Sequence, residues 1–381
     1  MTNKFKKVEN ISYGNRIKNS FMGVIVGLML FLTSIFFTCV NEASYIDNIK
    51  KINLMKENAI EISSSKIDRS NDNKLISTNG SVYSDETLQD EFIKIDNALA
   101  LKRTVEMYQW QERKYTHKNR NNGISSNSIT EYYYDKIWTD RELNSSDYND
   151  KSYKNPKFSV HNKIISVNKA FMGDFELIPE QLLEMTSFSS VTISDPKINY
   201  MIYNNSYYKG KNPTNPQIGD IRISYSYVPT GTPLSIIGQQ KRDNTIGKDF
   251  DKKIDVYAQY DGSLTLNEML SRLKNENITN TNSFRLWSFL MMFIGLNLLV
   301  NPIKIIVGYI PFLETFVEYI SIFALFLISI ALTLIIIAII WLFYKPLFSG
   351  SIIAIIVFTV IWYKKHIKQN NQETHSSVQL Q

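Results

Sequence analysis

Cysteine and histidine, which often bind metals or act as nucleophiles and bases, are scarce in this sequence. Its 381 residues include one cysteine, Cys39, and four histidines. No disulfide can form within the chain, and no Cys/His cluster has the spacing of a zinc site. Nor does any Cys/His or Ser/His/Asp arrangement, P-loop or G-x-G-x-x-G fingerprint point to catalysis. We expect a protein that is not an enzyme and that has no metal and no cofactor.

Acidic side chains do not form an obvious catalytic pair either. Asp85 with Glu86, and Asp90 with Glu91, lie on a polar stretch, where a solvated surface is the simpler interpretation. Carboxylate catalysis has no fixed spacing along a sequence. A membrane-anchored enzyme with a site in the large polar region therefore stays open as an alternative.

Charge is absent from several long apolar runs. Residues 21–40 contain no charged side chain, and about 20 apolar residues span a bilayer as a helix. Residues 321–344 and 347–363 are also uncharged, and residues 286–308 contain only Lys304, whose long side chain can reach the interface. We predict four transmembrane helices, one N-terminal and three C-terminal. A cleaved signal peptide or a lipoprotein signal fits the first run less well, because the run is long and lacks a small-residue cleavage site.

Positive charge gathers in the tails beside these helices. Residues 1–20 carry a net charge of +4 and residues 346–381 one of +2, whereas residues 41–284 carry −1. This is the positive-inside pattern, with both ends in the cytoplasm. It argues against a nucleic-acid partner, which would require a basic patch on the folded domain.

The fold class that follows is an α+β integral membrane protein with a large β-rich, non-cytoplasmic domain. The predicted parts are a cytoplasmic basic tail at 1–20, transmembrane helix 1 at 21–40, the β-rich lumenal or periplasmic domain at 41–284, transmembrane helix 2 at 286–308, a cytoplasmic or interfacial connector at 309–320, transmembrane helices 3 and 4 at 321–344 and 347–363, and a cytoplasmic tail at 364–381.

Strand patterns fill the region between the first two membrane helices. In residues 219–229 apolar and polar side chains alternate, which predicts a strand with one buried and one wet face. Asn79-Gly80 predicts a tight turn between two short strands. Two aromatic strands joined by a polar loop place Tyr108 and Trp110 on one face of the first strand, and Tyr132, Tyr134 and Trp138 on one face of the second. These aromatic faces are either a framework of the domain or a ligand-binding surface. A closed apolar pocket with convergent carboxylates near them would favour an enzyme.

Small and polar residues inside the apolar runs are candidates for helix packing. Gly23 and Gly27 form a G-x-x-x-G motif, which permits close helix contact either within the chain or in a homo-oligomer. Asn297 lies within the second predicted helix, where an amide usually bonds to a neighbouring helix and occasionally marks a transport path.

Several short blocks resemble the LUMA family, also called transmembrane protein 43. They are VGLMLFLTSIFFTCVNE at 26–42, VEMYQW at 105–110, NP at 155–156, GDIRISYSY at 219–227, FIGLNL at 293–298 and WLFYKPL at 341–347. The order of the blocks and the one-plus-three helix layout also match. The resemblance implies no catalytic residues, and it marks as architectural Glu106, Tyr108, Trp110, Asn155, Pro156, Gly219, Asp220, Arg222 and Tyr225.

The resemblance also implies a function. Animal members are described as membrane scaffolds of the endoplasmic reticulum and inner nuclear membrane that self-associate and organise other membrane proteins. We therefore expect a multi-pass scaffold, a homo-oligomer with other membrane proteins as partners. It would lie in the endoplasmic reticulum or inner nuclear membrane of a eukaryote, or in the inner membrane of a bacterium. The alternatives are a bacterial stress-response or lipid-handling protein, or a membrane-anchored enzyme.

Overall fold

The protein divides into two compact units. The computed structural model describes residues 3–121, 125–248, 255–307 and 311–344, together with residues 354, 358, 359 and 361. A β-rich unit comprises Met1–Asn10, Lys50–Asn119 and Asn127–Lys274. A helical unit comprises Ile11–Ile49, Arg120–Ser126 and Asn275–Gln381.

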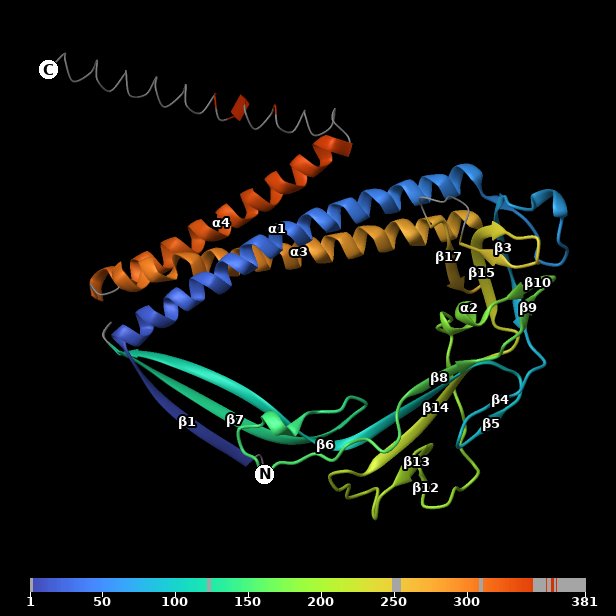
Figure 1. Ribbon diagram of the computed structural model, residues 1–381, viewed down its shortest axis with the longest axis horizontal. Coiled ribbons are helices and arrows are strands. Elements are labelled where there is room, and N and C mark those ends of the chain that lie inside the picture. The colour runs from blue at the N-terminus through green and yellow to red at the C-terminus, as the bar shows by residue number, and fades with distance from the viewer. Residues whose placement is uncertain are drawn as a thin grey trace. The chain divides into compact units, whose positions relative to one another are not determined.

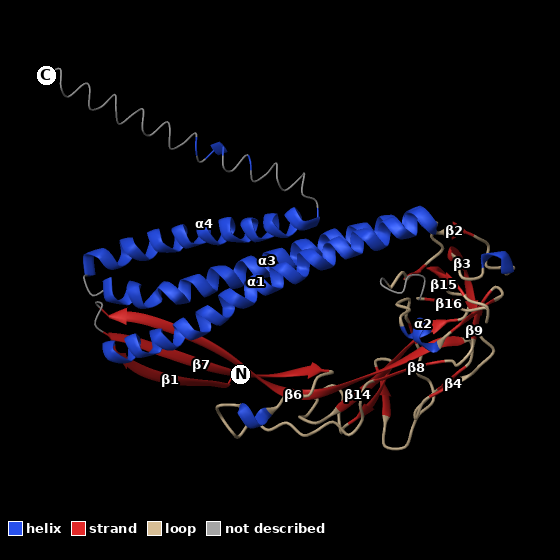
Figure 2. Ribbon diagram, turned by 45° about the horizontal axis from the view of Figure 1, so that its top comes forward, coloured by secondary structure: helices blue, strands red, loops and turns tan. Residues whose placement is uncertain are grey.

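Three long helices dominate the helical unit: α1 (Tyr13–Asn58), α3 (Leu266–Val307) and α4 (Pro311–Tyr344). Each contains a stretch long and apolar enough to cross a membrane, namely Lys18–Asn58, Leu266–Ile305 and Ser321–Tyr344. Figures 1 and 2 show α1 and α3 side by side over their length. At 1.5 Å per residue α1 is about 69 Å long, whereas a bilayer core is about 30 Å thick. The helix must therefore continue beyond the membrane.

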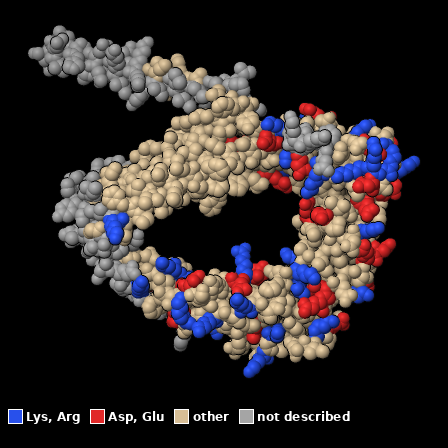
Figure 3. Space-filling view, in the orientation of Figure 1, with Lys and Arg blue, Asp and Glu red and all other residues tan. Residues whose placement is uncertain are grey.

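The surface of the long helices differs from that of the strands in its content of charged side chains. In Figure 3 the long helices present a face almost free of Lys, Arg, Asp and Glu, whereas both signs of charge mix over the strands. Large apolar side chains exposed on α4 include Phe323, Leu327 and Leu334. Exposed apolar surface of this kind belongs in lipid or against another membrane helix.

An eight-stranded sheet is one of the two main sheets of the β-rich unit. Its strand order is β1-β7-β6-β14-β13-β12, with β8 also paired to β6 and β11 to β14. The strands are β1 (Asn3–Ser12), β6 (Ala98–Asn121), β7 (Ser125–Thr139), β8 (Lys163–Ser166), β11 (Ser189–Ser190), β12 (Met201–Tyr203), β13 (Ser206–Lys209) and β14 (Ile221–Pro229).

A second sheet is centred on β3 and β15. Its order is β10-β9-β3-β15-β16, with β2 on β3 and β17 on β15, and β4 pairs separately with β5. The elements are β2 (Ile60–Glu61), β3 (Leu75–Tyr83), β4 (Leu88–Gln89), β5 (Lys94–Ile95), β9 (Ala170–Met172), β10 (Phe175–Leu177), α2 (Pro179–Leu183), β15 (Pro233–Gln240), β16 (Ile246–Gly247), β17 (Ala258–Asp261) and the 3-10 turns Arg69–Asn71 and Ser145–Asp147.

Alternation along β6 and β14 puts one face of the first sheet in the core. Val105 and Met107 of β6 and Ile221 and Ile223 of β14 are buried in one apolar cluster. A second cluster joins the end of α1 and the start of α3 to the second sheet, through Met55, Met269 and Leu270 packed with Leu75 and Ile237. The two helices that contain membrane spans thus also complete the core of the β-rich unit.

These features confirm the α+β membrane class with a β-rich domain and three candidate spans. The predicted fourth helix, 347–363, lies almost wholly outside the described residues. Residues 41–58 and 266–284, predicted within the domain, continue α1 and α3. Residues 311–320 of the predicted connector already belong to α4.

One prediction about a turn was wrong. Asn79 and Gly80 make no turn: β3 is continuous, and these residues pair with Ser235 and Leu234 of β15. Gly80 serves instead for close packing, because a Cβ there would lie 2.5 Å from Ser64 Oγ. Residues 3–12, which lie in the predicted cytoplasmic basic tail, form the edge strand β1 on β7.

Candidate functional site

The two glycines of the G-x-x-x-G motif have different environments. A Cβ on Gly27 would lie 2.8 Å from the carbonyl oxygen of Gly295 and 2.8 Å from Leu298 Cβ. A Cβ on Gly23 would meet only Leu298 Cδ2, at 3.8 Å. The structure therefore places Gly27 where the backbones of α1 and α3 touch within one chain, and Gly23 beside a contact with more room.

Within the part of the chain that the structure describes, Asn297 makes no hydrogen bond to a neighbouring helix, contrary to the usual behaviour of such an amide. Its side-chain nitrogen donates to the carbonyl oxygen of Phe293 one turn earlier, at 2.8 Å. Its side-chain oxygen accepts from Lys304 Nζ at 3.0 Å. The side chain of Lys304 therefore lies along α3 toward Asn297, and Asn297 is its hydrogen-bond partner inside the predicted span.

A buried ion pair joins the three helices of the helical unit. Glu42 of α1 is fully buried, and its two oxygens accept from Arg285 Nε and Nη2 of α3, at 2.6 and 2.7 Å. Trp341 Nε1 of α4 donates to the same carboxylate at 2.8 Å. Arg285 also lies over the ring of Tyr45, 5.8 Å from its centroid. The cluster satisfies a charge that would otherwise be costly to bury.

The sequence carried a signal for this cluster that reasoning on motifs missed. Glu42 follows the first uncharged run, and Arg285 stands just before the second. Complementary charges at the ends of two antiparallel apolar helices fall at one level and can pair. Glu42 and Trp341 lie in two of the family blocks, whereas Arg285 lies outside all of them, so no block marks it as their partner.

The architectural residues of β6 and β14 come together on the outer face of the first sheet. Glu106 and Arg222 are directly opposed in the strand register and form a bidentate ion pair at 2.6 and 2.8 Å. Arg222 lies over the ring of Trp138, 4.6 Å from its centroid. Tyr108 packs on the same indole, with ring centroids 5.3 Å apart. One row of side chains thus alternates charge and aromatic surface across three strands.

The remaining architectural residues hold loops against these strands. Asn155 accepts from the backbone N–H of Trp110 at 2.7 Å and donates to its carbonyl oxygen at 2.8 Å, as a neighbouring strand would. Pro156 packs against Gly219, whose φ of +94° favours glycine and where a Cβ would lie 3.0 Å from Pro156 Cγ. Asp220 accepts from the Tyr208 hydroxyl at 2.5 Å and from the backbone N–H of Gln217 at 2.8 Å.

Tyr225 belongs to a buried charged network on the core side of the sheet. Its hydroxyl donates to Asp90 Oδ2 at 2.6 Å, and Arg103 Nη1 donates to the same oxygen at 2.8 Å. Burial and the hydrogen bond to Asp90 raise the pKa of Tyr225 above its ordinary value. Asp90 was expected on a solvated surface but is 9% exposed. Its acidic neighbour Glu91 does have an exposed side chain. The surface interpretation therefore holds for one of the two acids, and the other faces the core.

The space around Trp110 and Tyr134 is filled. The rings of Tyr134 and Tyr153 stack with centroids 3.9 Å apart, and Trp110 packs edge-on against Tyr153 at 4.7 Å. Tyr134 is buried, and its hydroxyl donates to Glu112 at 2.6 Å. Tyr153 was not foreseen as a member of this cluster. Here the aromatic strands form a packed framework.

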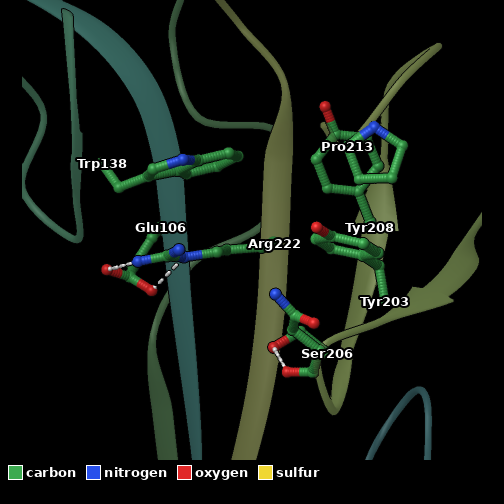
Figure 4. A pocket seen from close by; sticks show the side chains of 8 residues that line it. Glu106, Trp138, Tyr203, Ser206, Tyr208, Pro213 and Arg222 are labelled. Atoms are coloured by element: carbon green, nitrogen blue, oxygen red, sulfur yellow. Dashed lines mark hydrogen bonds and ion pairs between the residues drawn. The ribbon is translucent and has the colours of Figure 1, made fainter. Parts of the chain in front are cut away.

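A pocket opens on the same face of the sheet, at Glu106 of β6 rather than at Trp110. Its volume is about 230 Å³, and its lining consists of Glu106, Trp138, Tyr203, Asn204, Ser206, Tyr208, Pro213 and Arg222. In Figure 4 Trp138 lies over the guanidinium of Arg222, with Tyr203, Tyr208 and Pro213 on the opposite side. Within the described ranges of the chain, no three His, Cys, Asp or Glu side chains are grouped to hold a metal ion.

Comparison with known proteins gives one consistent result. The sequence profile of the family Transmembrane protein 43 matches residues 107–346. Transmembrane protein 43 of Homo sapiens is 25% identical over 376 residues, which cover 94% of this chain and 93% of that protein. The Transmembrane protein 43 homolog of Drosophila melanogaster is 23% identical over 220 residues, covering 56% of this chain and 58% of that protein. No solved structure matches.

Proposed function

Because the chain belongs to the transmembrane protein 43 family, as its sequence blocks predicted, we propose that it is a multi-pass membrane scaffold that self-associates and organises other membrane proteins. The supporting observation is that α1 and α3 contain two of the candidate spans and also complete the core of the β-rich unit. Insertion into the membrane and folding of the β-rich unit, which would present partners, then depend on the same two helices.

Self-association in this proposal uses a surface other than the G-x-x-x-G motif. Gly27 is already in contact with Gly295 inside the chain. The exposed apolar face of α4, which includes Phe323, Leu327 and Leu334, is the surface we assign to a second copy or another membrane protein. In water such a face would aggregate, whereas in a bilayer packing alone decides between lipid and protein.

The proposed topology has four spans, with residues 347–363 as the fourth. Both tails then lie in the cytoplasm and the β-rich unit on the other side, as the charge of the tails favours. We propose the endoplasmic reticulum or inner nuclear membrane for a eukaryotic source and the inner membrane for a bacterial one.

We propose a non-catalytic role for the β-rich unit. An enzyme would need convergent acid and base groups at a substrate site. The pocket of the outer face is lined by one carboxylate, Glu106, and both its oxygens already accept from Arg222. The aromatic cluster at Trp110 and Tyr134 is packed rather than open.

The test measures the mass of the complex that the protein forms in native membranes. Lysine-directed crosslinking before solubilisation, followed by mass measurement in a mild detergent, should give a homo-oligomer with further membrane proteins attached. A variant with Phe323, Leu327 and Leu334 replaced by alanine should be smaller, while replacing the buried Leu325 tests loss of stability alone. A monomer without crosslinked partners would contradict the scaffold.

A further inference from the structure

The pocket on the outer face draws on several separate parts of the β-rich unit. Glu106 of β6 and Arg222 of β14 form its floor, and Trp138 comes from the end of β7. The β12–β13 hairpin and the loop containing Pro213 supply the remaining walls. At about 230 Å³ the pocket is smaller than the roughly 300–1,000 Å³ of sites for drug-sized ligands. It therefore suits one ring rather than a long molecule.

The charges of the floor cancel. Glu106 and Arg222 are joined by two hydrogen bonds of 2.6 and 2.8 Å, the geometry in which Arg and carboxylate neutralise each other best. A cationic ligand would meet the guanidinium, and an anionic ligand would meet the carboxylate. An uncharged ligand avoids both repulsions.

Hydrogen-bonding capacity nevertheless remains on both charged groups. A guanidinium has five N–H donors, of which Glu106 takes two, and no further acceptor for Arg222 occurs among the described residues. Each carboxylate oxygen keeps a second lone pair. Asn204 and Ser206 on the hairpin add further polar groups. A ligand with neighbouring hydroxyls could accept from Arg222 and donate to Glu106 at once.

Aromatic surface supplies the apolar part of the site. Trp138, Tyr203 and Tyr208 line the pocket, and stacking of Arg222 on Trp138 fixes the planes of both groups. Tyr203 is 37% exposed, so part of its surface is free. A saturated six-membered ring with C–H groups on its faces and hydroxyls on its rim can use these aromatic surfaces and the polar floor together.

The walls are held in place without a ligand. Asn204 and Asn205 both have positive φ, +45° and +56°, as the two central residues of a tight hairpin turn do. Asn205 anchors that turn by accepting from the backbone N–H of Ile193 and donating to the carbonyl oxygen of Val191. On the other side Asp220 accepts from the Tyr208 hydroxyl. A pocket built in advance loses little entropy when it binds.

We propose that this pocket binds one pyranose ring, presented either by a free saccharide or by the headgroup of a glycolipid. A pyranose is uncharged, fits the volume, and combines hydroxyls at its rim with apolar C–H faces. This binding activity is separate from the scaffold function, since it uses none of the helix surfaces assigned to self-association.

The experiment measures binding of methyl pyranosides to the full-length protein in nanodiscs. Maltoside and glucoside detergents must be absent, because their headgroups are themselves pyranoses. Tryptophan fluorescence and ligand-observed NMR should show saturation by at least one of the gluco, galacto and manno forms, with Kd in the millimolar range or below. Tyr203→Ala should weaken that binding about tenfold or more, which corresponds to roughly 1.4 kcal/mol. Tyr203→Leu serves as a second variant that keeps apolar bulk on the edge strand.

The matched control is Tyr83→Ala, which removes an exposed tyrosine of β3 outside the pocket and should leave binding unchanged. Saturation by free methyl pyranosides supports the proposal with a soluble source. Saturation only when a glucosyl lipid is added to the nanodisc supports it with a membrane source. Saturation by neither, equal weakening by Tyr83→Ala, or occupancy by a proline-rich peptide in place of sugars would overturn it.

Discussion

At the scale of single residues, Glu42 depends on its partners because its carboxylate is fully buried among apolar helices. Arg285 and Trp341 together give it three hydrogen bonds. Removing one member of a buried ion pair leaves the other charge without compensation, which typically costs about 3–5 kcal/mol. The side chain of Arg285 is 32% exposed, so water relieves part of that cost and the lower end applies.

Glu42→Gln should therefore lower the free energy of unfolding by about 3 kcal/mol. Reversible unfolding in mixed micelles, followed by circular dichroism, measures the change. Glu57→Gln, at an exposed position of the same helix, should change the stability by less than about 0.5 kcal/mol.

The double variant Glu42→Met with Arg285→Met distinguishes the contribution of the ion pair to stability from that of side-chain packing. It removes both charges and keeps apolar bulk, so it should be more stable than either single variant. If its loss instead equals the sum of the two single losses, the ion pair is not what stabilises this point of the bundle.

Buried tyrosines make the β-rich unit sensitive to alkaline pH. Burial raises the pKa of Tyr134, Tyr208 and Tyr225, and hydrogen bonds donated to Glu112, Asp220 and Asp90 raise them further. Burial also raises the pKa of Tyr257. In the unfolded chain these phenols ionise near pH 10. Above that pH the unfolded state releases protons that the folded state retains, so stability is complete below about pH 10 and falls as the pH rises.

Each such tyrosine should contribute a slope of about 1.4 kcal/mol per pH unit above about pH 10. Urea unfolding of the detergent-solubilised protein between pH 8 and 11 measures the slope. Tyr225→Phe should lower this slope by the contribution of one tyrosine, about 1.4 kcal/mol per pH unit. The variant should also be less stable below pH 10, because Asp90 loses a hydrogen-bond donor. Equal slopes for the variant and the parent would contradict this account.

At the scale of secondary-structure elements, the crossing of α1 and α3 depends on one glycine more than on the other. Gly27→Ala would place a methyl group 2.8 Å from the carbonyl oxygen of Gly295, so the helices must separate. Overpacking of this kind costs about 1–3 kcal/mol. Unfolding in detergent should show a loss of that size for Gly27→Ala.

Gly23→Ala is the matched control on the same helix face. Its Cβ would meet only Leu298 Cδ2 in ordinary contact at 3.8 Å, and alanine has the higher helix propensity. The variant should be neutral or more stable by up to about 1 kcal/mol. If both variants instead abolish self-association and leave the monomer stable, the motif is an interface between copies.

Elements with a strong local pattern could be predicted, and those fixed by distant partners could not. The alternation of Ile221, Ile223 and Tyr225 was enough to identify β14 and its buried face. Asn79-Gly80 has the composition of a turn, yet pairing with β15 along its length keeps β3 extended. The ion pair of Glu106 with Arg222, 116 positions apart, requires a strand register that no local signal supplies. The resemblance marked both residues without revealing that they meet.

At the scale of the whole molecule, the proposed topology and strand β1 make opposite demands on the N-terminal tail. Residues 1–20 carry a net charge of +4, which favours the cytoplasm. Residues 3–12 also form β1 on β7, and a strand can pair only with a strand on its own side of a membrane. Because β1 is the last strand of its sheet, it can leave while β7 stays paired to β6. We therefore expect β1 to be paired when no bilayer separates the tail from the sheet, and unpaired in the membrane.

Cysteines at Phe5 and Tyr132 test this expectation, since the two rings lie 6.2 Å apart between centroids. In a Cys39→Ser background, a short bismaleimide should crosslink the pair in detergent-solubilised protein and leave it uncrosslinked in sealed native membranes. Phe5→Cys alone controls for crosslinks between copies. A membrane-impermeant maleimide added from the cytoplasmic side should label position 5 and leave position 132 unlabelled. Crosslinking in sealed membranes would instead put the tail and the sheet in one compartment, and the proposed topology would then be wrong.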